Sequence, residues 1–169
     1  MIILLGYMGS GKSAVGKSLA VKLNQPFLDF DEYIEQKEGI SVTTIFQEKG
    51  EIYFRKIEHL YLKELLDENR NMVLSLGGGT PCYSNNIALL LKATPHVFYL
   101  NVGIGTLVER LLKEKSHRPV IAHLTEENLP EFIGKHLFER NSFYQQAHHH
   151  VNANKKTIEE LVNEIGALI

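Results

Sequence analysis

Eight residues near the start of the chain constrain its fold more than any other feature. Residues 6–13 read G-Y-M-G-S-G-K-S and fit the pattern G-x-x-x-x-G-K-[ST]. In this pattern several backbone N–H groups surround phosphate oxygens, and glycine lets the backbone come close enough to do so. The pattern needs a strand before it and a helix after it, because the amino end of a helix attracts anions.

The flanking sequence supplies both elements. Ile2–Leu5 is a short apolar run of the kind found in buried strands, and Lys12–Leu23 places Val15, Leu19 and Leu23 on one helical face. We therefore interpret residues 6–13 as a phosphate-binding loop for a nucleoside triphosphate, ATP. Lys12 is expected to bring positive charge to the outer phosphates, and Ser13 to offer its hydroxyl to Mg²⁺.

Strands and helices are expected to alternate along the rest of the chain. Further strands are predicted at Phe27–Phe30, Met72–Leu76, His96–Leu100 and His148–Ala153. Helices are predicted at residues 31–39, 41–46, 51–69, 84–91, 106–114, 130–147 and 157–168. This alternation indicates an α/β protein with a parallel sheet covered by helices on both faces and ligands beyond the carboxyl ends of the strands. The polar segment Lys115–Leu129 is expected to be a mobile surface loop.

Composition excludes several classes of function. A length of 169 residues fits one domain, and a formal net charge of -2 argues against general affinity for nucleic acid or an anionic membrane. No apolar run reaches membrane-spanning length, and the single cysteine, Cys82, fits a reducing compartment. We expect a cytoplasmic protein, and a monomer.

Two carboxylates close the second expected strand. Alternation along a strand would place Asp29 and Asp31 on one side and Phe30 on the other. One carboxylate would help to hold hydrated Mg²⁺, and the other would accept a proton or a hydrogen bond from an acceptor hydroxyl. The alternative interpretation is that Asp31 only caps the next helix while Asp29 lies at a solvated edge.

Glycines and arginines provide a second group of candidates. Gly77, Gly78 and Gly79 directly follow the third expected strand, which predicts a close approach or an unusual φ there, or alternatively a tight turn before Pro81. Arginine suits the two-pronged binding of carboxylate or phosphate, although a single arginine is more often a solvated surface charge. The arginines of interest are Arg55, Arg110, Arg118 and Arg140.

Taken together, these residues resemble the shikimate kinase family. The resemblance rests on the loop at 6–13, Asp29-x-Asp31, G-E-I-Y-F-R at 50–55 with Glu58, the glycines at 77–79, Arg118-Pro119, and E-R-x-x-x-Y at 139–144. Order and spacing agree from residue 1 to about residue 154. The chain departs from the family's usual pattern after Ala147, where His148–His150 and V-N-A-N at 151–154 follow.

The resemblance implies a fold. It is a P-loop kinase three-layer sandwich whose five-stranded parallel sheet has the order 2-3-1-4-5, with a mobile lid. All of residues 1–169 would form one domain. Residues 31–62 would be its substrate-binding helical region, and residues 114–128 its lid.

The resemblance also implies two sets of ligand-binding residues. On the nucleotide side, Asp29 would meet Mg²⁺ through water beside the ligand Ser13, and ATP would contact Gly9, Ser10, Gly11, Lys12, Ser13, Ala14, Arg110 and Arg118. On the acceptor side, Arg55 and Arg140 would grip the shikimate carboxylate. The remaining implied acceptor residues are Asp31 and the backbone of Gly77, Gly78 and Gly79, with Glu58 orienting an arginine and Phe46 and Phe54 shaping the pocket.

The implied reaction is phosphorylation of the 3-hydroxyl of shikimate by ATP, giving shikimate 3-phosphate and ADP, in the biosynthesis of chorismate and the aromatic amino acids. Lys12, Asp31 and Arg118 would be the catalytic residues, and Mg²⁺ the cofactor. One alternative is another small-molecule P-loop kinase such as a gluconate kinase. A second is a nucleotide-dependent switch without catalysis.

Overall fold

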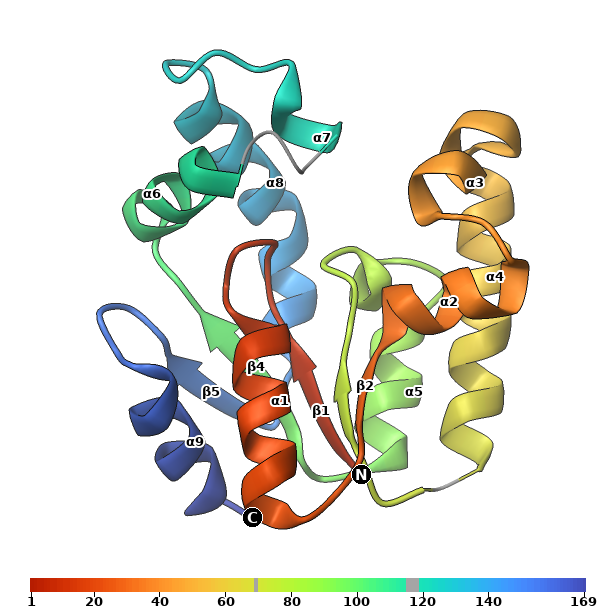
Figure 1. Ribbon diagram of the computed structural model, residues 1–169, viewed down its shortest axis with the longest axis vertical. Coiled ribbons are helices and arrows are strands. Elements are labelled where there is room, and N and C mark those ends of the chain that lie inside the picture. Colours follow the sequence, from red (N-terminus) through yellow and green to blue (C-terminus); the bar gives the residue numbers. More distant parts are fainter. Residues whose placement is uncertain (69, 115–118) are drawn as a thin grey trace.

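The computed structural model describes residues 1–68, 70–114 and 119–169, and Figure 1 shows their arrangement. The strands are β1 (Ile2–Leu5), β2 (Phe27–Asp29), β3 (Val73–Ser75), β4 (Val97–Asn101) and β5 (His149–Asn152). They form one parallel sheet in the order β2-β3-β1-β4-β5, which confirms the predicted topology. All four residues of β1 are buried, as expected for the central strand of a parallel sheet.

Helices cover both faces of this sheet. In Figure 1, α1 (Lys12–Leu23) and α9 (Ile158–Gly166) lie side by side on the near face, with α5 (Asn86–Ala93) and α8 (Leu129–Tyr144) behind the strands. Two groups of helices rise beyond the carboxyl ends of the strands. The first contains α2 (Phe30–Glu38), α3 (Val42–Glu48) and α4 (Gly50–Asp67), and the second contains α6 (Ile104–Glu114), α7 (Pro119–Ala122) and the start of α8.

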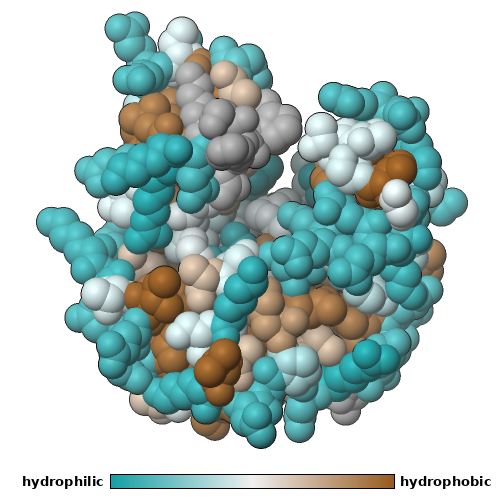
Figure 2. Space-filling view, in the orientation of Figure 1, coloured by the Kyte–Doolittle hydropathy of each residue, from teal (hydrophilic) through white to brown (hydrophobic). Residues whose placement is uncertain are grey.

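A hollow separates the two groups of helices. Figure 2 shows the surface indented between them, above the strand ends. Ligands of open α/β sheets bind at this position. No helix among the described residues is long and apolar enough to cross a membrane.

The expected geometry of the two carboxylates was wrong in one respect. β2 ends at Asp29, and Phe30 already belongs to α2, so Asp29 and Asp31 do not alternate along a strand. Asp29 is instead the N-cap of α2, because its Oδ1 accepts a hydrogen bond from the backbone N–H of Asp31 at 3.1 Å. Phe30 is completely buried, which fixes the first turn of α2 against the core.

Other differences lie in short elements. A 3₁₀ turn, η1 (Thr80–Cys82), follows the glycines and was not predicted, and the expected loop at Lys115–Leu129 contains α7 and the first residue of α8. Proline favours the first turn of a helix, and this accounts for both elements, since Pro81 lies in η1 and Pro119 begins α7. Arg118 and residues 115–117 of the expected lid lie outside the described residues.

Candidate active site

The phosphate-binding loop takes its shape from glycine. Gly9 and Gly11 have φ values of 77° and 94°, in the region that L side chains rarely adopt, and Gly11 is the N-cap of α1. Lys12 is buried, with 9% of its surface exposed, and its Nζ donates to the backbone oxygens of Gly6 at 2.9 Å and Tyr7 at 3.0 Å. The loop therefore curls around the lysine at the amino end of α1.

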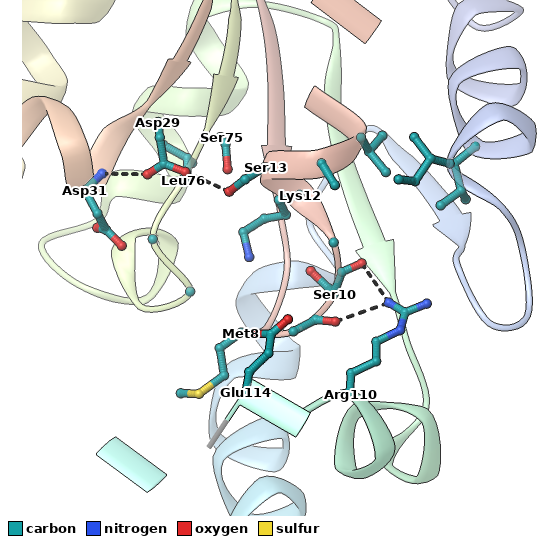
Figure 3. Close-up of a pocket in the computed structure, with 18 of the residues that line it drawn as sticks. Met8, Ser10, Lys12, Ser13, Asp29, Asp31, Ser75, Leu76, Arg110 and Glu114 are labelled. Carbon is teal, nitrogen blue, oxygen red and sulfur yellow. Dashed lines mark hydrogen bonds between the residues drawn. The ribbon is translucent and has the colours of Figure 1, made fainter. Parts of the chain in front are cut away.

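The loop forms one wall of a cavity of about 450 Å³, which we call the nucleotide cavity (Figure 3). Asp29 and Asp31 also line it, and so do Lys156, Ile158 and Leu161 from the chain after β5. Every described residue that the sequence assigned to ATP or Mg²⁺ lines this cavity: Gly9, Ser10, Gly11, Lys12, Ser13, Ala14, Asp29 and Arg110.

Arg110 joins the loop to the chain after β5. Its Nη1 donates to the backbone oxygens of Gly9 at 3.2 Å and Ser10 at 3.3 Å, and its Nη2 donates to that of Ala153 at 3.4 Å. Figure 3 shows the two contacts with the loop. The guanidinium thus joins the phosphate-binding loop to the segment that leads to Lys156, which also lines the cavity.

Ser13 and Asp29 bring together two polar side chains that suit a hard cation in the nucleotide cavity. Ser13 Oγ donates to Asp29 Oδ2 at 2.8 Å, which brings a hydroxyl and a carboxylate together. Such oxygen ligands fit Mg²⁺, which keeps several waters and takes few protein ligands. No cluster of three or more His, Cys, Asp or Glu side chains suited to a metal occurs in the described part of the chain.

A second cavity of about 300 Å³, which we call the acceptor cavity, adjoins the first. It is built by segments far apart in sequence, namely α2, α3, α4, the glycine turn at residues 77–79 and α8. Both predicted carboxylate-gripping arginines, Arg55 and Arg140, line it. The other lining residues are Met8, Asp31, Val42, Phe46, Phe54, Glu58, Gly77, Gly78, Gly79 and Val120.

Arg55 is held on several sides. Its Nη1 donates to Glu58 Oε2 at 2.8 Å, and Glu58 is buried with 1% of its surface exposed. The centre of its guanidinium lies 3.8 Å from the ring centroid of Tyr83 and 5.0 Å from that of Phe54. Close aromatic rings and a buried carboxylate leave this side chain little freedom, so the cation is presented to the cavity in a fixed direction.

The glycine turn makes room for charged side chains. None of Gly77, Gly78 and Gly79 has a positive φ, so close approach and not backbone strain explains the sequence. A Cβ at Gly77 would lie 2.7 Å from Asp31 Oδ1, and one at Gly79 would lie 2.9 Å from Arg55 Nη2. Any larger residue at these two positions would displace a carboxylate or a guanidinium that lines the acceptor cavity.

Asp31 lies where the two cavities meet, because it lines both. Burial raises the pKa of its carboxyl to about 6, with further contributions from the negative charges of Asp29 and Glu58, while Lys12 lowers it. A carboxyl with a pKa this close to neutrality can accept a proton as well as a hydrogen bond.

Arg140 approaches the acceptor cavity from α8 and contacts the phosphate-binding loop. Its guanidinium lies 5.6 Å from the ring centroid of Tyr7, and the Tyr7 hydroxyl lies 3.3 Å from His136 Nδ1. One turn after Arg140, the buried Tyr144 donates its hydroxyl to the backbone oxygen of Gly78 at 2.5 Å. α8 is thereby fastened both to the loop and to the glycine turn.

Sequence reasoning missed several residues that shape the site. It assigned no role to Tyr83 or Thr80, and none to Tyr7 or Met8 beyond their places in the motif, although Met8 lines both cavities. The signal for Tyr83 and Thr80 is their position directly after the glycines, where the chain must turn back toward α4.

Fold and site together define a kinase of the P-loop class with a separate cavity for a small acceptor. The model of the shikimate kinase family matches residues 8–169, and the chain belongs to that family. A shikimate kinase from Flavobacterium johnsoniae is 48% identical over 164 residues, which cover 97% of this chain and 95% of that protein.

Solved structures agree with this assignment. The crystal structure of shikimate kinase from Bacteroides thetaiotaomicron superposes with a TM-score of 0.92 at 38% identity, covering 99% of this chain and 96% of the other. Shikimate kinase from Acinetobacter baumannii in complex with shikimate gives a TM-score of 0.87 at 34% identity, covering 99% and 90%. A gluconokinase from Sinorhizobium meliloti, at 19% identity with a TM-score of 0.54, shares the fold alone.

Proposed function

We propose that this chain transfers the terminal phosphoryl group of ATP to the 3-hydroxyl of shikimate, giving shikimate 3-phosphate and ADP. Membership of the shikimate kinase family supports the reaction. The observation that carries the site assignment is the position of Asp31, which lines both the nucleotide cavity and the arginine-lined acceptor cavity. An acceptor hydroxyl beside Asp31 would lie next to the terminal phosphate.

On the acceptor side, Arg55 and Arg140 would hold the shikimate carboxylate from two directions, since both line the acceptor cavity. Asp31 would accept a hydrogen bond, and then a proton, from the reacting hydroxyl. Gly77 to Gly79 would let the substrate approach the backbone closely. Held at these points, shikimate can present one hydroxyl to the phosphate, and this positioning supplies a large part of the rate enhancement.

On the nucleotide side, the backbone N–H groups of Gly9 to Ala14 and the Lys12 ammonium would surround the phosphates. Arg110 would lie beside the adenine. Ser13 and Asp29 would hold Mg²⁺, which when bound neutralises phosphate charge. Phosphoryl transfer passes through a loose transition state, so the protein contributes mainly positioning and charge stabilisation. Arg118 is proposed as a catalytic and ATP-binding residue from the resemblance alone, because it lies outside the described residues.

The alternatives are less well supported. A gluconokinase shares only the fold, at 19% identity, whereas a shikimate kinase is 48% identical over 97% of the chain. A switch without catalysis would not need Asp31 at the junction of the two cavities. We also propose a monomer acting in the cytoplasm, with residues 1–169 as one domain. Within it, residues 31–62 would be the acceptor-binding region and residues 114–128 a lid, of which Val120 already lines the acceptor cavity.

The proposal is tested by a coupled ADP-release assay with ATP and Mg²⁺, in which shikimate, gluconate and no acceptor are compared. ADP release that depends on shikimate supports the reaction. Release with gluconate but not shikimate would keep the kinase and discard this acceptor, and release indifferent to any acceptor would indicate an ATPase or a switch.

A further inference from the structure

A chain of polar side chains runs behind Arg55, on the side away from the nucleotide cavity. Thr80 Oγ1 donates to Glu58 Oε1 at 2.6 Å, while Glu58 Oε2 accepts from Arg55 at 2.8 Å. Asn86 Nδ2 donates to the backbone oxygen of Thr80 at 2.9 Å, and Asn86 Oδ1 lies 2.7 Å from His59 Nδ1. This hydrogen-bonded network therefore connects α4, η1 and the start of α5 to the guanidinium that faces the acceptor cavity.

The side chains at the centre of this network are buried. Thr80 and Asn86 have 0% of their surface exposed, and Glu58 has 1%. Neither Thr80 nor Asn86 lines the nucleotide cavity or the acceptor cavity, so neither would touch a substrate. Their side chains are hydrogen-bonded within the network, to Glu58, to His59 and to the backbone of Thr80. These contacts fix a single arrangement of the side chains.

The arrangement gives each oxygen of Glu58 a separate partner. A buried carboxylate oxygen that loses its donor carries a desolvation penalty, so it turns toward whichever donor remains. Arg55 and Thr80 each donate to one oxygen of Glu58, so without the Thr80 hydroxyl the carboxylate would turn toward Arg55 and draw the guanidinium toward α4. With the hydroxyl in place, Arg55 donates its Nη1–H to Glu58, and its Nη2 lies beside the glycine turn.

We propose that Thr80 is a positioning residue for acceptor binding, which acts through Glu58 to set the direction of Arg55, and that Asn86 holds Thr80 in place. The proposal rests on the proposed function, because it assumes that Arg55 binds the carboxylate of shikimate. It extends that function to a residue that lies outside both cavities.

The test compares steady-state kinetics of Thr80→Val, which keeps the shape of the side chain but loses the hydroxyl, and Thr80→Ser, which keeps the hydroxyl. Thr94→Val is the matched control, because Thr94 is also buried and its hydroxyl donates at 2.8 Å to the backbone oxygen of Met1, at the opposite end of the strands. Thr80→Val loses the hydrogen bond to Glu58, whereas Thr94→Val loses two, because Thr94 Oγ1 also accepts from the backbone N–H of His96 at 3.2 Å. A general loss of stability would therefore affect the control at least as strongly.

Thr80→Val is expected to raise the KM for shikimate about tenfold while the KM for ATP changes less than about twofold. Thr80→Ser should remain within about threefold of the unmodified protein, and Thr94→Val should change neither KM. In a Glu58→Gln background, Thr80→Val should add little, because the two residues act in series. If Thr80→Val does not fold, Thr80→Ala removes the hydroxyl without placing a methyl group against the carboxylate, and the same comparison applies.

An unchanged KM for shikimate in folded Thr80→Val or Thr80→Ala would overturn the proposal, and so would a Thr80→Ser variant impaired as strongly as Thr80→Val. Equal effects of Thr80→Val on both substrates, or an effect of the same size from Thr94→Val, would also overturn it. Failure of the proposed function itself is recognised separately, because the unmodified protein would then show no shikimate-dependent ADP release.

Discussion

The two cavities of this protein are built in different ways. The nucleotide cavity takes most of its binding groups from one continuous segment, residues 9–14, whose backbone and helix terminus provide the donors. The acceptor cavity draws Asp31, Arg55, the glycine turn and Arg140 from separate elements, and side-chain contacts hold these together. The first is a local structure that the sequence specifies directly, whereas the second exists only when the whole domain is folded.

This difference predicts different consequences of mutation. A change in the loop should affect phosphoryl transfer to any acceptor, whereas a change in the acceptor cavity should affect one substrate and leave nucleotide binding intact. The predictions below test that separation in order of decreasing expected effect.

The largest effect is expected for Lys12→Ala. Lys12 donates to the backbone oxygens of Gly6 and Tyr7, and in the proposed function it would carry the charge next to the phosphates. We expect kcat to fall about 10³-fold or more, measured by ADP release at saturating shikimate. The separation of the two cavities would be wrong if shikimate binding, measured by calorimetry without nucleotide, were lost to the same extent.

Asp31→Asn is expected to lower kcat by about 10²- to 10³-fold, since an amide cannot take the proton of the acceptor hydroxyl. The same change should stabilise the fold. The raised pKa of Asp31 means that its ionised carboxylate destabilises the folded protein. This loss of stability develops as the pH rises from the ordinary pKa of 3.8 to about 6, and it is complete above that pH. At pH 8 the free energy of unfolding should rise by about 1–3 kcal/mol in denaturant titrations. Near-normal turnover would exclude Asp31 as a base or as an essential anchor of the hydroxyl.

Arg55→Ala is expected to raise the KM for shikimate by about 30- to 100-fold while the KM for ATP stays within about twofold, because the proposed contact that it removes would be a charge-assisted hydrogen bond to the acceptor. Arg70→Ala is the matched control, since Arg70 is exposed and pairs with Glu68 beyond the end of α4. An unchanged KM for shikimate in Arg55→Ala would remove Arg55 from the acceptor site.

The smallest expected effect is a shift in a pH profile. The pKa of Asp31 is raised to about 6, so kcat/KM for shikimate should fall as the pH drops through about 6 and the carboxyl becomes protonated. The charge of Asp29 contributes to that rise. Asp29→Asn should therefore move this fall in kcat/KM, the acidic limb of the pH profile, to lower pH, whatever its effect on the maximum rate. Glu32→Gln, an exposed carboxylate of α2, should leave the limb in place. An unmoved limb in Asp29→Asn would assign the titration to another group.

The contrast between the cavities also explains what could be predicted from the sequence. The strand order was implied by the family resemblance, and the loop that lines the nucleotide cavity followed from a local motif and from the apolar periodicity around it. Asp31 was named as a candidate, but its orientation relative to Asp29 was predicted from strand alternation. The observed arrangement depends on Asp29 capping α2, which is a contact that periodicity does not report. The approach of Thr80 to Glu58 joins residues 22 positions apart and could be seen only in the folded protein.

The most direct test of the account is to identify the phosphorylated product by ¹H–³¹P correlation NMR after incubation of the protein with ATP, Mg²⁺ and shikimate. The account predicts one new phosphorus signal coupled to the ring proton at carbon 3 of shikimate. A phosphorus coupled to another carbinol proton, or inorganic phosphate as the sole product, would contradict the claim that Asp31 brings the 3-hydroxyl to the terminal phosphate of ATP.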